Sequence, residues 1–118
     1  PTSHYEAPPC QADEVPAAPH GADGALCAPA CHGAFDHCSS DLPANTTASP
    51  GCVLRDPTSG KKYCALECIG DFECPKGARC STTTMGFSGL CVYPNARAAA
   101  TLALVGPPAA PVAAELVV

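Results

Sequence analysis

Ten cysteines in a chain of 118 residues constrain the fold more than any other feature of this sequence. Their number is even, and the chain has few residues from which to build an apolar core, with 19 Leu, Ile, Val and Phe residues and no Trp. A chain this poor in large apolar side chains rarely folds by burying them alone. We therefore predict up to five disulfides, each worth about 2–4 kcal/mol. The predicted bridging residues are Cys10, Cys27, Cys31, Cys38, Cys52, Cys64, Cys68, Cys74, Cys80 and Cys91.

The predicted disulfides also indicate the compartment and the kind of partner. Disulfides persist where reductants are excluded, so we expect the extracellular space, the secretory pathway or an organelle lumen such as the thylakoid lumen. The net charge is −5, and Lys61-Lys62 is the one adjacent basic pair, so neither nucleic acid nor an anionic membrane surface is expected as a partner. The sequence begins at Pro1 rather than Met, which fits a removed targeting segment or a fragment.

Cysteine spacing divides the chain into four predicted segments. Residues 1–26, rich in Pro and Ala and anchored at Cys10 alone, are expected to form an extended arm without regular strands. Two cysteine-rich modules follow, at 27–53 and 54–94. Both contain the pattern Cys-Ala-x-x-Cys-x-Gly-x-Phe, which indicates one small unit used twice. An apolar tail, residues 95–118, ends the sequence.

Turn residues predict two short β-hairpins. The first joins residues 52–55 to 62–64 through the turn Asp56–Gly60, and the second joins residues 78–84 to 90–93. We therefore expect a small disulfide-rich fold of irregular loops and short hairpins.

The start of the tail predicts one short helix. Asn95 is a good N-cap for an alanine-rich segment from Ala96 to about Val105, and Gly106 with the prolines after it would end the helix. A membrane span needs about 20 continuous apolar residues. Prolines interrupt this segment, so we predict no span, although placement close to a membrane is compatible with the tail.

A cluster of Cys and His residues raises the question of a metal site. Cys27, Cys31, His32, His37 and Cys38 are of the residue types that bind zinc. The second copy of the repeat keeps its cysteines but has Ile69 and Glu73 where the first has histidines. A repeated unit that keeps Cys and loses His favours disulfides over zinc, and no metal or other cofactor is predicted.

Catalytic patterns are lacking in the sequence. An even cysteine count leaves no spare thiol for a Cys nucleophile, and the sequence has neither a G-x-S-x-G nor an H-E-x-x-H motif. Asp71 and Glu73 lie between two cysteines on an expected exposed loop, where a carboxylate pair lacks the cleft that acid–base chemistry needs. We predict that the protein is not an enzyme.

Two further features point to the surface. Asn45-Thr46-Thr47 is an N-glycosylation sequon. The apolar tail is expected to dock on a protein partner through Leu102, Leu104, Val105, Val112, Leu116, Val117 and Val118.

The stretch from Cys64 to Pro94, which contains C-P-K-G-A-R-C and G-L-C-V-Y-P, resembles small secreted cysteine-rich modules of the EGF-like and EB-like kind. Residues Cys27 to Val53 are similar to a lesser degree. The resemblance implies an extracellular-type disulfide fold. EGF domains also have a Cys-x-Cys pair, which this chain lacks, so their disulfide connectivity and calcium binding are not carried over.

These observations predict a non-catalytic accessory or structural subunit that docks on a larger extracellular or lumenal assembly through its termini. An algal photosystem is one such setting suggested by the alanine-rich composition. The alternative is a free secreted binding module or protease inhibitor, with the loop Asp56–Lys62 offering Lys61 or Lys62 to a trypsin-like pocket. The sequence leaves the disulfide connectivity open.

Overall fold

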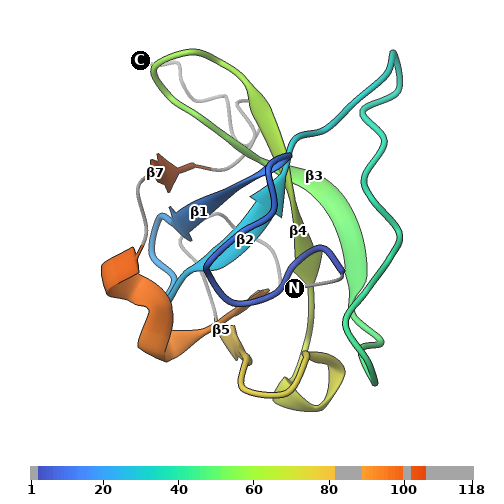
Figure 1. Cartoon of the computed structure of the whole chain (residues 1–118), viewed down its shortest axis with the longest axis vertical. Coiled ribbons are helices and arrows are strands. Elements are labelled where there is room, and N and C mark those ends of the chain that lie inside the picture. Colours follow the sequence, from blue (N-terminus) through green and yellow to red (C-terminus); the bar gives the residue numbers. More distant parts are fainter. Residues whose placement is uncertain (1–2, 82–88, 100–101, 106–118) are drawn as a thin grey trace.

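The structure, a computed structural model, describes residues 3–81, 89–99 and 102–105, which form two small β-sheets (Figure 1). One sheet has three strands in the order β2-β1-β7, and the other has four in the order β3-β4-β6-β5. The elements are β1 (Glu14–Pro19), β2 (Leu26–Pro29), β3 (Ser49–Arg55), β4 (Lys62–Glu67), the 3-10 helix η1 (Asp71–Glu73), β5 (Arg79–Ser81), β6 (Leu90–Val92), the 3-10 helix η2 (Pro94–Ala99) and β7 (Leu102–Leu104).

The four-stranded sheet contains both predicted hairpins. β3 and β4 are antiparallel, with Cys52 opposite Cys64 and an irregularity in register between Cys52 and Leu54. β5 and β6 are also antiparallel, with Cys80 opposite Cys91. The prediction of short hairpins is therefore confirmed, although most of the second hairpin's turn lies outside the described residues.

The three-stranded sheet corrects the expectation that the proline-rich N-terminal segment has no strand. β1 contains Pro16, which has no N–H to donate. Pro16 lies opposite Cys27 in the β1–β2 pair, and the Cys27 N–H donates to the Glu6 carbonyl, away from β1. Pro16 and Cys27 therefore form a non-hydrogen-bonded pair, in which the backbone nitrogens face away from the partner strand. The N–H that Pro16 lacks would not have bonded to β2, so no hydrogen bond between β1 and β2 is lost. Proline spacing alone was therefore a poor guide to this strand.

The end of the described chain differs from the prediction. In place of a helix from Ala96 to about Val105, the six-residue 3-10 helix η2 is followed by β7, which runs parallel to β1. An isolated ten-residue helix is marginal in water, whereas β7 gains a strand partner and buries Leu104 completely. Tertiary packing has overridden helix propensity here. Within the described ranges, no helix is long and apolar enough to cross a membrane.

One cluster of buried side chains joins the two sheets. Isolated β-bridges connect Ala25 to Tyr93 and Ala30 to Tyr63 across them. Much of the cluster is Ala and Cys, and its largest fully buried members are Tyr5, Leu26, Leu54, Leu66, Leu90, Val92 and Leu104. These residues come from all parts of the described chain, while the division into modules at Val53 stays a prediction.

All ten cysteines are paired, which confirms the prediction of five disulfides. The bonds are Cys10–Cys27, Cys31–Cys52, Cys38–Cys64, Cys68–Cys80 and Cys74–Cys91. The bond from Cys38 to Cys64 links the two predicted modules. Multiple disulfides are consistent with an oxidising compartment.

Candidate functional site

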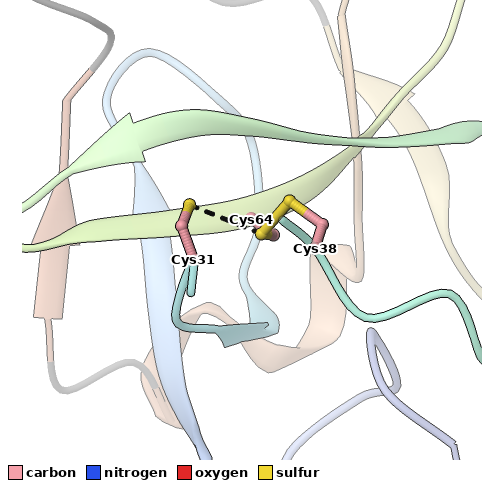
Figure 2. A group of neighbouring side chains, drawn as sticks. All are labelled: Cys31, Cys38 and Cys64. Carbon is pink, nitrogen blue, oxygen red and sulfur yellow. Dashed lines mark hydrogen bonds between the residues drawn. A yellow bond between two sulfur atoms is a disulfide. The ribbon is translucent and has the colours of Figure 1, made fainter. Parts of the chain in front are cut away.

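Four of the five disulfides are grouped in two adjacent pairs. In the first pair, which we call the first sulfur cluster, Cys31–Cys52 lies beside Cys38–Cys64. Figure 2 shows the Cys31 sulfur directed towards the Cys38–Cys64 bond, and its Sγ atom lies 3.5 Å from the Sγ atom of Cys64. Such close neighbours place two covalent crosslinks at one point of the fold.

The second pair, the second sulfur cluster, consists of Cys68–Cys80 and Cys74–Cys91. The Sγ atoms of Cys68, Cys74 and Cys91 all lie within 4.8 Å of one another, and all three residues are buried. Cys80 is half-buried. The two clusters therefore share a plan in which an accessible disulfide lies against a more buried one.

Each sulfur cluster anchors a short loop at both ends. The first loop, residues 32–37, runs between Cys31 and Cys38, and the second loop, residues 69–73, runs between Cys68 and Cys74. In Figure 1 the first loop lies at the upper right and the second at the bottom, so they point towards opposite ends of the long axis.

Hydrogen bonds stiffen both loops. In the first loop, His32 and His37 exchange backbone hydrogen bonds of 3.0 and 2.7 Å, and the Asp36 carboxylate pairs with Lys62 at 2.7 Å. In the second loop, the Ile69 N–H donates to the Glu73 carboxylate at 2.6 Å. The loops are thus held from within as well as at their ends.

Large apolar side chains are exposed on these two loops. Phe35 is 83% exposed, Ile69 77% and Phe72 79%. Phe35 and Phe72 occupy the same position in the repeated sequence pattern. Apolar side chains on rigid loops are typical of surfaces that bind other proteins. The sequence pattern contained both phenylalanines, but nothing in it distinguished an exposed position from a core position.

The cysteines of the candidate zinc site are all used in disulfides. Cys27 bonds to Cys10, Cys31 to Cys52 and Cys38 to Cys64. His32 and His37 are both exposed, with ring centroids 6.2 Å apart. Because a zinc thiolate site needs unbonded sulfurs, the residues present do not form one in this oxidised fold.

Asp71 and Glu73 serve the second loop. Asp71 accepts a hydrogen bond from the Cys80 N–H at 2.8 Å, and Glu73 accepts the one from Ile69. The two carboxylates therefore accept hydrogen bonds from different backbone N–H groups and so stabilise the second loop.

The loop Asp56–Lys62, the candidate contact of a protease inhibitor, is held by backbone hydrogen bonds within the fold. The carbonyl of Lys61 accepts a hydrogen bond from the Asp56 N–H at 2.9 Å, and that of Lys62 accepts one from the Cys31 N–H at 3.0 Å. A serine protease binds the carbonyl of the residue in its specificity pocket with its own oxyanion hole. Each candidate carbonyl already accepts one hydrogen bond within the fold, and the inhibitor alternative stays a prediction.

Asn45 lies on the surface, as a glycosylation site requires. It is exposed, with a φ of 62°, in the segment between Cys38 and Cys52. Its modification stays a prediction.

Among the apolar residues expected to dock on a partner, Leu104 is placed differently from the prediction. Leu104 is fully buried in the chain's own core, and Val105 is half-buried and paired with Arg55. Leu102 belongs to β7, and Val112, Leu116, Val117 and Val118 lie outside the described residues. Leu104 therefore stabilises this fold and does not face a partner.

A charged clamp at the N-terminus was not predicted from the sequence. The Nδ1 atom of His4 lies 2.7 Å from an Asp41 carboxylate oxygen, and its Nε2 atom lies 2.8 Å from an oxygen of Asp13. The His4 side chain is 14% exposed. Its burial alone would lower the pKa of His4, but the hydrogen bonds to Asp13 and Asp41 and their negative charges raise it above 6.5. Residues 37 positions apart in the chain form this clamp, so no local signal could have revealed it.

A second carboxylate holds the same segment. Glu14, which is 6% exposed, accepts hydrogen bonds from the backbone N–H groups of Tyr5 at 2.9 Å and Gln11 at 3.2 Å. Burial raises the pKa of Glu14. The Tyr5 hydroxyl donates to the Ser39 carbonyl at 2.8 Å. The N-terminal segment is thus integrated into the fold at several points besides Cys10.

The clamp predicts a pH-dependent stability. The pKa of His4 is raised in the folded state, so the stabilisation is complete below pH 6.5 and is lost as the pH rises through the raised value. Burial alone would raise the pKa of Asp41, but its hydrogen bonds and the positive charge of His4 together lower it, so acid weakens the clamp only as the pH falls below 3.8. Because both carboxylates are about half exposed to water, we expect the loss to be about 1 kcal/mol or less.

Urea unfolding at pH 6 and pH 8.5 measures this loss. The variant His4→Gln should lose the difference between the two pH values, whereas the matched control His37→Gln should keep it. An unchanged pH dependence in His4→Gln would show that another group is responsible.

No protein-family model, curated protein or solved structure matches this chain.

Proposed function

We propose that this protein is a non-catalytic, disulfide-stapled subunit of a larger extracellular or lumenal assembly, to which it binds through its two anchored loops. The observation that carries the proposal is the exposure of Phe35, Ile69 and Phe72 on loops whose ends are fixed by disulfides. Aromatic residues contribute strongly to protein interfaces when they become buried there.

The anchoring of the loops supports a binding role. A loop that is already ordered loses little conformational entropy on binding, so more of the interaction energy appears as affinity. In the second loop the two apolar side chains lie between Cys68 and Cys74, both of which are buried. This arrangement offers a partner a small rigid apolar surface with the acidic residues Asp71 and Glu73 beside it.

The two loops point in different directions, which favours contact with more than one partner surface. A rigid body with an apolar loop near each end suits a linking subunit. This proposal replaces docking through Leu104, while the part of the tail outside the described residues retains its predicted docking role. A photosystem as the parent assembly stays a prediction from composition.

Incorporation into the parent complex in the native host tests the proposal. The triple variant Phe35→Ser, Ile69→Ser, Phe72→Ser should lose its place in the complex, because hot-spot residues contribute about 2 kcal/mol or more each, or about 30-fold in affinity. The fraction of chain that co-migrates with the complex on native gels is the measurement.

The matched control is Lys76→Ser, which changes an exposed residue outside both loops and should be incorporated like the wild type. All three proteins should show five disulfides on peptide mapping. Normal incorporation of the triple variant would overturn the proposed role of the loops.

A further inference from the structure

In the first sulfur cluster two disulfides that differ in burial have sulfur atoms in contact. Disulfides that only stabilise a fold do not require this arrangement. Both residues of the Cys31–Cys52 bond are half-buried, whereas in the Cys38–Cys64 bond Cys38 is half-buried and Cys64 is fully buried. A reagent from solvent therefore reaches the Cys31–Cys52 bond more readily than the Cys64 sulfur. The Cys31 sulfur is also only 3.5 Å from the Cys64 sulfur, which is about the distance of van der Waals contact between two sulfurs (Figure 2).

We propose that the first sulfur cluster is a thiol–disulfide exchange site, in which Cys31, once released from Cys52, bonds to Cys64 and releases Cys38. The co-substrate that starts the exchange is a dithiol reductant, such as a protein with two neighbouring thiols. The exchange moves one free thiol from Cys31, at the start of the first loop, to Cys38, at its end, while Cys52 on β3 stays free.

The reaction balances in three steps. A thiolate of the dithiol attacks the Cys52 sulfur, so a mixed disulfide forms and Cys31 leaves as a thiolate. The second thiolate of the reductant attacks the mixed disulfide, which oxidises the dithiol and leaves Cys52 as a thiol. The Cys31 thiolate attacks the Cys64 sulfur, the Cys38–Cys64 bond breaks, and Cys38 leaves as a thiolate that takes a proton from water. Two electrons have passed from the dithiol to the protein, which keeps one bridge in the cluster.

The distances require only a small movement for the third step. The Cys31 sulfur lies within 4.8 Å of the sulfurs of both Cys38 and Cys64. Attack in line with the bond would place the Cys31 sulfur one S–S bond length farther from Cys38 than from Cys64. It lies 3.5 Å from the Cys64 sulfur and at most 4.8 Å from the Cys38 sulfur, which is short of that alignment, so the Cys31 side chain must turn about its Cα–Cβ bond. Breaking the bond to Cys52 is what frees this rotation. The backbone can stay in place because the sulfurs are already neighbours.

The exchange has a consequence for the first loop. In the structure, Cys38 anchors the C-terminal end of this loop to β4 through Cys64. After the exchange, Cys31 holds Cys64 and Cys38 is free. The loop that carries Phe35 then has one covalent anchor in place of two.

Limited reduction of the wild-type protein tests the proposal. The folded chain is treated with one equivalent of dithiothreitol at pH 8, free thiols are trapped with N-ethylmaleimide, and the bonds are mapped under non-reducing conditions. We expect the label on Cys38 and Cys52, together with a new Cys31–Cys64 bond. Label on Cys31 and Cys52 with the Cys38–Cys64 bond intact would overturn the proposal.

Two variants should each form the Cys31–Cys64 bond, one starting from a free Cys31 and the other from a free Cys64. Cys52→Ala leaves Cys31 free, and Cys38→Ala leaves Cys64 free. Both should contain the Cys31–Cys64 bond, with the free thiol on Cys38 in the first variant and on Cys52 in the second. Retention of the original bond in both variants would contradict the exchange.

The matched control is Cys27→Ala. It leaves Cys10 free, and among the described residues the Cys10–Cys27 disulfide belongs to neither sulfur cluster. The label should stay on Cys10, with the other four bonds unchanged. If a variant fails to fold, limited reduction of the wild type still decides the question.

Discussion

Complete reduction of the five disulfides is expected to unfold this protein at 25 °C and neutral pH. The bonded cysteines are separated by 12 to 26 positions in the sequence. For loops of that length the chain-entropy model gives about 3 kcal/mol per disulfide, or about 15 kcal/mol for five. The total stability of a small domain is about 5–15 kcal/mol, so the remaining interactions do not hold the chain together.

Far-ultraviolet circular dichroism of the reduced and alkylated chain is the measurement. The β-sheet signal should disappear along with the cooperative thermal transition. The control is the oxidised protein carried through the same alkylation, which should keep both. A cooperative transition in the reduced chain would mean that apolar burial suffices, and the argument that this protein depends on its disulfides would be wrong.

Truncation of Leu104 is expected to destabilise the protein by about 2–5 kcal/mol. Leu104 is fully buried in the cluster that joins the two sheets. Replacing a buried leucine with alanine loses the transfer free energy of the removed atoms and leaves a cavity. In a core with so few large side chains, the neighbours have little capacity to fill that space.

Urea denaturation of Leu104→Ala measures the effect as a lower midpoint with an unchanged slope. The neighbouring residue supplies the control, since Ala103 is exposed on the same strand. Ala103→Ser should remain within about 0.5 kcal/mol of the wild type. Wild-type stability in Leu104→Ala would remove this residue from the core and restore its predicted role in docking.

The sequence predicted those parts of the fold that depend on local signals or on composition. The scarcity of large apolar residues and the even number of cysteines indicated the disulfides. The turn at Asp56–Gly60 indicated the hairpin of β3 and β4. The turn signal acts over a few residues and the cysteine count is a property of the whole composition, so neither depends on which distant segments come into contact.

The predictions that failed depended on distant contacts. The alanine-rich segment after Pro94 has local helix propensity, but β7 forms because β1, more than 80 residues earlier, offers a strand edge and a buried position for Leu104. The pairing of Cys38 with Cys64, which the sequence left open, also depends on where β4 lies in the finished fold. Composition and spacing contain neither piece of information.

The exposure of the phenylalanines on the first and second loops could not be predicted for a different reason. A phenylalanine in a chain with a small core is expected to be buried, yet Phe35 and Phe72 are mostly exposed. The exposure of Phe35 and Phe72 is seen only in the structure, where the disulfides hold the two loops at the surface.

The pairing of β1 with β7 has a consequence for biosynthesis. The residues from Ala17 to Pro19 find their parallel partners at Leu102 to Leu104, so one edge of the first sheet stays open during translation until the latter have left the ribosome (Figure 1). All ten cysteines have been synthesised by then. The oxidative folding machinery therefore meets a chain that can already form every crosslink before its last strand has docked, and the order of these two events determines which pairings become permanent.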